Sequence, residues 1–116
     1  MKVELIDHKV YINGKHKDFG HYIYKAEYIN DLYIVTFSPE KLAQEDKYRN
    51  VFAFDKDFKK VWQIEGIDVQ PDGTQALFAG TNLGPTSRRT VTTTDGYVYF
   101  IDPLTGKILG YAGWTK

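Results

Sequence analysis

The sequence repeats one strand pattern three times at nearly constant spacing. An alternating apolar segment that ends in Asp begins at Val3, Val51 and Val98, so successive copies start 48 and 47 residues apart. Each copy is followed by a second segment that opens with Lys and a β-branched residue. Period-two alternation marks half-buried strands, and self-similarity at a spacing of about 40 to 50 residues is typical of repeat architectures. The pattern therefore predicts an all-β, antiparallel fold of about ten strands.

The repeats divide the chain into three parts of a single β domain. Residues 1–23 are predicted to form an N-terminal hairpin and loop, in which residues 15–17, Lys-His-Lys, read as a basic loop. Residues 24–66 and 67–116 are each predicted to form a four-stranded unit, the second of which begins with a strand at residues 67–69. A chain of 116 residues is long enough to bury one core. Almost no helix is expected, because no window keeps a helical period.

Each four-stranded unit contains one polar insert. The inserts span residues 39–50 and 81–90, and the first is predicted to open with a helical turn in which Ser38 caps Pro39. Counting strands places both inserts between the second and third strands of their units. Equivalent slots of stacked repeats lie on the same rim, so we expect the two inserts to lie side by side.

The alternation also predicts which side chains face the core. Within a strand, residues that share a face recur at every second position, so one face of each strand can be assigned to the interior. The predicted inward residues are Leu5, Ile34, Val51, Ala53, Val61, Leu77, Val98 and Phe100.

The last hairpin carries the most specific motif. Residues 95–109 read D-G-Y-V-Y-F-I-D-P-L-T-G-K-I-L and resemble the blade motif of quinoprotein-type β-propellers, and residues 70–73, Q-P-D-G, resemble a turn of WD-repeat blades. The resemblance covers residues 67–112, and residues 51–66 match more weakly because residues 56–59 replace the Thr-Gly turn. It implies a partial, half-propeller-like array of a hairpin and two four-stranded blades. Closed rings typically have four or more blades, so the resemblance implies no central channel or quinoprotein active site.

Composition excludes several classes of function. With 15 basic and 15 acidic residues, the chain has no net charge to attract nucleic acid or an anionic membrane. Arg88 and Arg89 beside Tyr97 could stack on single-stranded RNA, but the charge balance disfavours that reading. The absence of Cys excludes disulfides, a thiolate nucleophile and Cys-ligated zinc. No window resembles a signal peptide or a membrane span, so we expect a cytoplasmic protein.

Residues that could support catalysis or bind metal are not arranged for it. The three histidines are His8, His16 and His21. Their spacings of eight and five residues do not place two ligands close together on one strand face. The Asp that ends each repeated strand fits a turn acceptor, and neither Ser38 nor Ser87 lies in a Gly-x-Ser-x-Gly nucleophile motif. We therefore expect no enzyme activity, no cofactor and no metal.

A protein-binding module is the function that remains. A small, cysteine-free, helix-poor domain with polar rim loops is similar in profile to bacterial immunity proteins, which neutralise toxins. We expect it to occlude the active site of a cognate toxin, such as a nuclease, with acidic groups in place of substrate phosphates. The predicted partner-binding residues are Glu40, Glu45, Asp46, Tyr48, Arg88 and Arg89.

The expected partner is thus a protein, with no direct contact to nucleic acid or membrane. Charges near both terminal strands should prevent edge-to-edge pairing, so we expect a monomer outside the complex. These charged residues are Lys2, Glu4, Lys107 and Lys116. Two alternatives are a self-assembling structural module, in which several chains complete a ring, and a small-ligand-binding protein with its pocket between the units.

Overall fold

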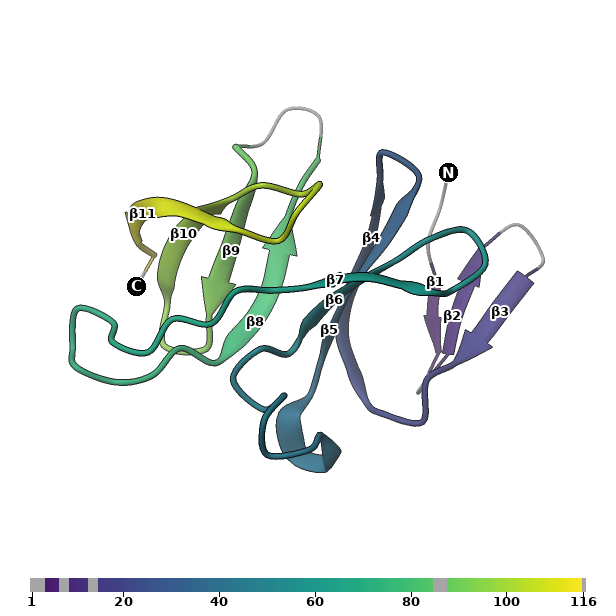
Figure 1. The fold of residues 1–116 in the computed structure, drawn as a ribbon, viewed down its shortest axis with the longest axis horizontal. Helices are drawn as coiled ribbons and strands as arrows, with labels where there is room; N and C mark the ends of the chain where they lie inside the picture. The colour runs from purple at the N-terminus through teal and green to yellow at the C-terminus, as the bar shows by residue number, and fades with distance from the viewer. Residues whose placement is uncertain (1–3, 7–8, 13–14, 85–87, 116) are drawn as a thin grey trace.

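A computed structural model describes residues 4–6, 9–12, 15–84 and 88–115, with side chains from residue 17 onward. This part of the chain forms eleven strands in three antiparallel sheets, together with one short 3-10 helix (Figure 1). The all-β prediction is confirmed. Within these residues, no helix is long and apolar enough to cross a membrane.

The N-terminal part is a three-stranded sheet rather than a hairpin and loop. It contains β1 (Glu4–Ile6), β2 (Lys9–Ile12) and β3 (Lys15–Asp18), in the order β1-β2-β3. The segment that was predicted to be a basic loop is therefore β3, which pairs with β2 from Lys9 opposite Asp18 to Ile12 opposite Lys15. Because β3 has no apolar residue, its sequence carries no alternation that could reveal the strand. The predicted inward residue Leu5 lies outside the described side chains.

The second sheet follows the predicted order of four strands. It contains β4 (Ile23–Ile29), β5 (Leu32–Phe37), β6 (Val51–Phe54) and β7 (Lys60–Gln63), in the order β4-β5-β6-β7. The 39–50 insert joins β5 to β6. It opens with the predicted helical turn, η1 (Pro39–Lys41), in which Ser38 has the N-cap position, but the Ser38 side chain makes no capping hydrogen bond, so the predicted cap is wrong.

The third sheet begins later in the chain than predicted. It contains β8 (Phe78–Asn82), β9 (Thr90–Thr93), β10 (Tyr97–Ile101) and β11 (Ile108–Trp114), in the order β11-β10-β9-β8. Residues 67–69 do not form the predicted strand. The backbone N–H of Ala76 instead bonds the carbonyl of Ile67 at 2.9 Å, which closes a loop before the sheet begins.

The three sheets stack in the order of the chain, and the second sheet is the middle layer (Figure 1). The main core lies between the second and third sheets. Its buried residues are Ile34, Val51, Ala53, Trp62, Ile64, Ala76, Phe78, Leu83, Val91, Tyr99 and Ile101. A second cluster, on the other face of the middle sheet, contains Ile23, Tyr33, Val35 and Phe37. The middle sheet is therefore buried on both faces.

The predicted inward residues are correct for β5 and β6, whereas at the other described positions the residue next to the predicted one faces the core. Ile34, Val51 and Ala53 are fully buried in the main core, as predicted. Val61 was predicted to face inward but is 50% exposed, because its neighbour Trp62 takes the interior position. Leu77, Val98 and Phe100 are likewise only half-buried and lie outside the core, where adjacent residues replace them. A one-residue error in phase moves every side chain of a strand to the other face.

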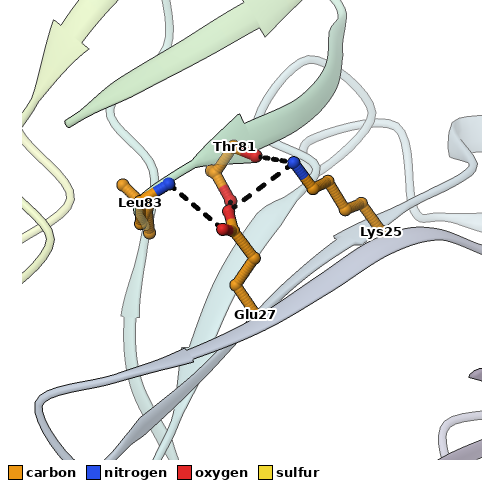
Figure 2. A network of polar contacts seen from close by, with 4 residues as sticks. All are labelled: Lys25, Glu27, Thr81 and Leu83. Carbon is orange, nitrogen blue, oxygen red and sulfur yellow. Dashed lines mark hydrogen bonds and ion pairs between the residues drawn. The ribbon is translucent and has the colours of Figure 1, made fainter. Parts of the chain in front are cut away.

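Two polar clusters join the middle sheet to β8. The Asn50 side chain is fully buried; its Nδ2 donates to the carbonyls of Phe37 and Phe78, both at 2.8 Å, and its Oδ1 accepts from Phe78 N at 3.1 Å. Farther along β8, the Glu27 carboxylate accepts from Thr81 Oγ1 at 2.6 Å and from Leu83 N at 3.1 Å (Figure 2). The second and third sheets are thus joined here by hydrogen bonds of the Asn50 and Glu27 side chains, and not by pairing between their strands.

Candidate functional site

An open pocket of about 370 Å³ lies beside the 39–50 insert. It is lined by Tyr22, Tyr24, Ser38, Glu40 and Lys41, and we call it the Tyr22–Tyr24 pocket. Its size is within the range of ligand pockets, which measure about 300 to 1,000 Å³.

The start of β4 builds the aromatic wall of the pocket. Ile23 is buried in the second cluster, whereas its neighbours Tyr22 and Tyr24 are 61% and 45% exposed. Tyr24 is the extra residue of a β-bulge, because the register shifts between Ile23 and Lys25. A bulge redirects a side chain without ending the strand. The two phenol rings are thus held in solvent by a backbone that is anchored in the core.

The insert builds the polar wall. Ser38 N donates to the carbonyl of Tyr22 at 2.8 Å, which ties the end of β5 to the start of β4. Pro39 is buried and begins η1, and Leu42 N closes the turn on the Pro39 carbonyl at 3.1 Å. This turn places the exposed Glu40 and Lys41 at the mouth of the pocket.

The pocket offers recognition chemistry. Its wall combines two exposed phenol rings with one carboxylate and one ammonium group. Tyrosine supplies contact area and a hydroxyl at little entropic cost, and it is enriched in the cores of protein interfaces. No group of three or more His, Asp or Glu residues that could hold a metal ion is present among the described residues.

Of the predicted residues in the first insert, Glu40 alone lines the pocket. Glu45 is exposed and Tyr48 is half-buried. Asp46 has a structural contact, because its Oδ1 accepts from Gln63 Nε2 of β7 at 2.9 Å. The neighbouring Arg49 similarly donates from Nε to the carbonyl of Ile64 at 2.9 Å. These bonds hold the insert against β7.

The described residues of the second insert lie at the opposite end of the strands from the first insert, so the prediction that the inserts lie side by side is wrong (Figure 1). The first insert joins the second and third strands of its sheet, whereas residues 83–89 join the first and second strands of theirs. β8 begins beside Asn50, where the first insert ends, and runs away from it to Leu83 beside Glu27. Arg88 and Arg89 are exposed but follow this far turn. The prediction counted residues 67–69 as the first strand of the third sheet. Because they form no strand, β8 is the first strand, and the second insert follows the first strand and not the second.

Of the histidine and serine candidates that the structure describes, Ser38 lines the pocket and His21 does not. His21 packs edge-on against Phe37, with ring centroids 5.6 Å apart. His8, Ser87 and the side chain of His16 lie outside the described residues. The missed site residues are Tyr22, Tyr24, Ser38 and Lys41. The alternation Tyr-Ile-Tyr around the buried Ile23 was a usable signal for the two tyrosines, whereas nothing local indicates that the insert approaches them.

Comparison with known proteins identifies one family. Residues 1–111 match the model of a family that is described as "Domain of unknown function (DUF7957)". No curated protein and no solved structure matches the chain.

Proposed function

We propose that this chain, which belongs to the family described as domain of unknown function DUF7957, is a non-catalytic protein-binding module of the immunity type. In this proposal it neutralises a bacterial toxin in the cytoplasm by covering the toxin's active site. The observation that carries the proposal is the Tyr22–Tyr24 pocket, in which two exposed phenol rings stand beside Glu40 on an anchored strand. Aromatic anchors in a concave site next to charged rim groups are the features of an interface hot spot.

In the proposal, the exposed carboxylates of the first insert face a basic partner, and the exposed Lys41 offsets part of their charge. Glu40 and Glu45 are exposed on the same insert, whereas Asp46 is held by Gln63. Carboxylates placed around aromatic anchors orient a basic surface and speed its association. A nuclease whose cleft normally binds phosphates has such a surface, so we propose a nuclease domain as the toxin.

The test is calorimetric titration of the chain with the protein that the adjacent gene encodes. Tyr22→Ala, Tyr24→Ala and Glu40→Lys should each raise the Kd by about tenfold or more, because each removes an anchor or reverses a charge. Val69→Ala and Asp68→Lys are matched controls, since both residues are exposed and lie far from the pocket in the sequence and outside its lining. Their Kd should be unchanged.

The possible outcomes of the titration test the proposed binding site and the proposed function independently. Undiminished affinity of all three pocket variants would show that the partner docks elsewhere. A wild-type chain that neither binds the neighbouring toxin nor protects cells from it would refute the immunity function.

The size of the pocket supports a second candidate function, the binding of a small ligand. A volume of about 370 Å³ suits a small polar molecule that stacks on Tyr22 and Tyr24. A ligand of this kind would shift the melting temperature of the isolated chain and not that of Tyr24→Ala. A screen of metabolites by thermal shift therefore distinguishes the two functions.

A further inference from the structure

Two carboxylates meet at the turns that flank the third sheet. Asp72 lies in the turn that precedes β8, and Asp95 lies in the turn between β9 and β10. Gln70 Nε2 donates to Asp95 Oδ2 at 3.3 Å and to Thr74 Oγ1 at 3.0 Å, and Thr74 Oγ1 donates to Asp72 Oδ1 at 2.5 Å. The Gln70 amide is thus hydrogen-bonded directly to Asp95, and it is linked to Asp72 through the Thr74 hydroxyl.

Within the described ranges, no cationic side chain pairs with the negative charge of Asp72 and Asp95. The hydroxyl of Thr93 donates to Asp95 Oδ1 at 2.5 Å, so every side-chain donor to the pair is a neutral group. Donation from the Thr74 hydroxyl, then from the Thr74 backbone N–H, lowers the pKa of Asp72, and the adjacent Asp95 side chain contributes to the same shift.

Aromatic rings border the carboxylates. Trp114 lies opposite Tyr97 in the β10–β11 pair, and its Nε1 donates to the backbone carbonyl of Asp95 at 3.1 Å. The ring of Tyr111 lies 6.3 Å from that of Tyr97 and 5.5 Å from that of Tyr99. Tyr111 and Trp114 are 52% and 59% exposed, so their ring faces are accessible.

Two buried acceptors in the same place have no donor. Gln70 is 3% exposed and Tyr99 is 6% exposed, yet Gln70 Oε1 and Tyr99 Oη lack a hydrogen-bond partner among the described residues. Gln70 Oε1 belongs to the amide that contacts Asp95, so the unsatisfied acceptor lies next to the carboxylates. A buried polar atom without a partner is unfavourable, and a ligand with N–H donors would satisfy it.

We propose that this group of residues, which we call the turn cluster, binds the guanidinium group of an arginine side chain from another protein. The turn cluster comprises Gln70, Asp72, Asp95, Tyr97, Tyr111 and Trp114. It belongs to the third sheet and shares no residue with the Tyr22–Tyr24 pocket, so the inference does not rest on the proposed function.

Guanidinium fits the turn cluster better than other cations do. Its five N–H donors lie in one plane and suit a pair of carboxylates with an amide acceptor beside them, while its flat face stacks on aromatic rings. A lysine ammonium is a compact, strongly hydrated charge that cannot stack in this way. We therefore expect arginine to bind more tightly than lysine, and both to bind more tightly than a neutral isostere.

The experiment is an NMR titration of the 15N-labelled chain with the peptide acetyl-Gly-Arg-Gly-amide and with its lysine and citrulline counterparts. The arginine peptide should shift the Trp114 indole N–H and the backbone N–H of Asp95. It should bind about tenfold more tightly than the citrulline peptide, and the shifts should shrink as salt is added. Asp95→Asn and Asp72→Asn should each weaken binding by about tenfold. Asp57→Asn, which changes a turn residue of the second sheet, should have no effect.

Three results would overturn the proposal. The first is equal binding of the arginine and citrulline peptides, or no binding of either at about 10 mM. The second is unchanged affinity in both Asp variants. The third is a set of NMR shifts that Ca²⁺ causes and the arginine peptide does not, which would make the turn cluster a metal site. If Asp95→Asn does not fold, as its NMR spectrum would reveal, Asp72→Asn and the comparison of peptides on the wild-type chain still decide.

Discussion

The second and third sheets come from the same strand repeat, yet they differ in how they are buried. In β5 of the middle sheet, five consecutive residues from Tyr33 to Phe37 are buried. In β10, by contrast, the buried residues Tyr99 and Ile101 alternate with the half-buried Val98 and Phe100. The neighbouring central strand β6, which is the counterpart of β10 in the repeat, keeps the alternation: Val51 and Ala53 are buried, and Phe52 and Phe54 are half-buried. The repeated strands β6 and β10 therefore share one alternation, whereas β5, which lies between two apolar clusters, is buried on both faces.

The hairpin turns of the two sheets show a second difference. Gly106 in the β10–β11 turn has φ +76°, and Phe58 in the β6–β7 turn adopts a similar left-handed conformation at φ +60°. A Cβ at Gly106 would lie 2.4 Å from the Trp62 ring, so only glycine fits there. Phe58 bears a steric cost of about 1 to 2 kcal/mol, and its stacking on Tyr33, with centroids 5.1 Å apart, offsets that cost. The left-handed backbone conformation is thus accommodated in the β10–β11 turn by a glycine, which has no side chain. In the β6–β7 turn it is accommodated by the packing of Phe58 on Tyr33.

The largest expected effect comes from breaking the junction between the two sheets. Asn50→Ala should destabilise the chain by about 3 to 5 kcal/mol, because it leaves two carbonyls and the Phe78 N–H without partners in a buried site. Urea denaturation followed by circular dichroism measures the loss. Gln44→Ala on the exposed insert is the control and should change stability little. A small effect of Asn50→Ala would mean that the sheets are held by apolar packing alone.

The second prediction compares the same substitution in both sheets. Val35 is fully buried in β5, and Val98 is half-buried on the outer face of β10. Val35→Ala should cost about 2 kcal/mol, from lost burial and the cavity left behind, and Val98→Ala less than about 1 kcal/mol. Chemical denaturation of the two variants under identical conditions provides the measurement. Equal losses would indicate that the outer face of the third sheet is covered in solution.

The smallest expected effect is a dependence of stability on acid pH. The Tyr28 hydroxyl, and then the charge of Lys56, lower the pKa of Asp31, and the Thr74 hydroxyl lowers the pKa of Asp72, from the ordinary value of 3.8. A carboxylate whose pKa is lower in the folded state stabilises the fold above pH 3.8, and this contribution is lost as the pH falls through the folded value. Both groups are exposed, so each effect should be slight.

Asp31→Asn and Asp72→Asn test this dependence, one in each region. Melting temperatures of each variant and of the wild type should differ at neutral pH and converge in strong acid. A difference that persists in acid would show that the lost contribution is a hydrogen bond to the turn and not the charge.

The amino-acid sequence by itself determined the local features of this protein. The apolar run around Ile34 and the alternation around Val51 and Ala53 identified strands, and Ser38 with Pro39 marked the start of η1. These features depend on neighbours within a few residues, where side-chain period and backbone preference act directly.

Only the tertiary structure decided which separate segments meet. It made residues 15–18 a third strand, left residues 67–69 outside the sheets, and so moved Arg88 and Arg89 to the end opposite Glu40. It also brought the insert to Tyr22 and Tyr24, which are far from it in the sequence. Pairing between distant strands depends on the packing of whole sheets, and a one-residue change of register exchanges buried and exposed faces. No short window of sequence contains that information.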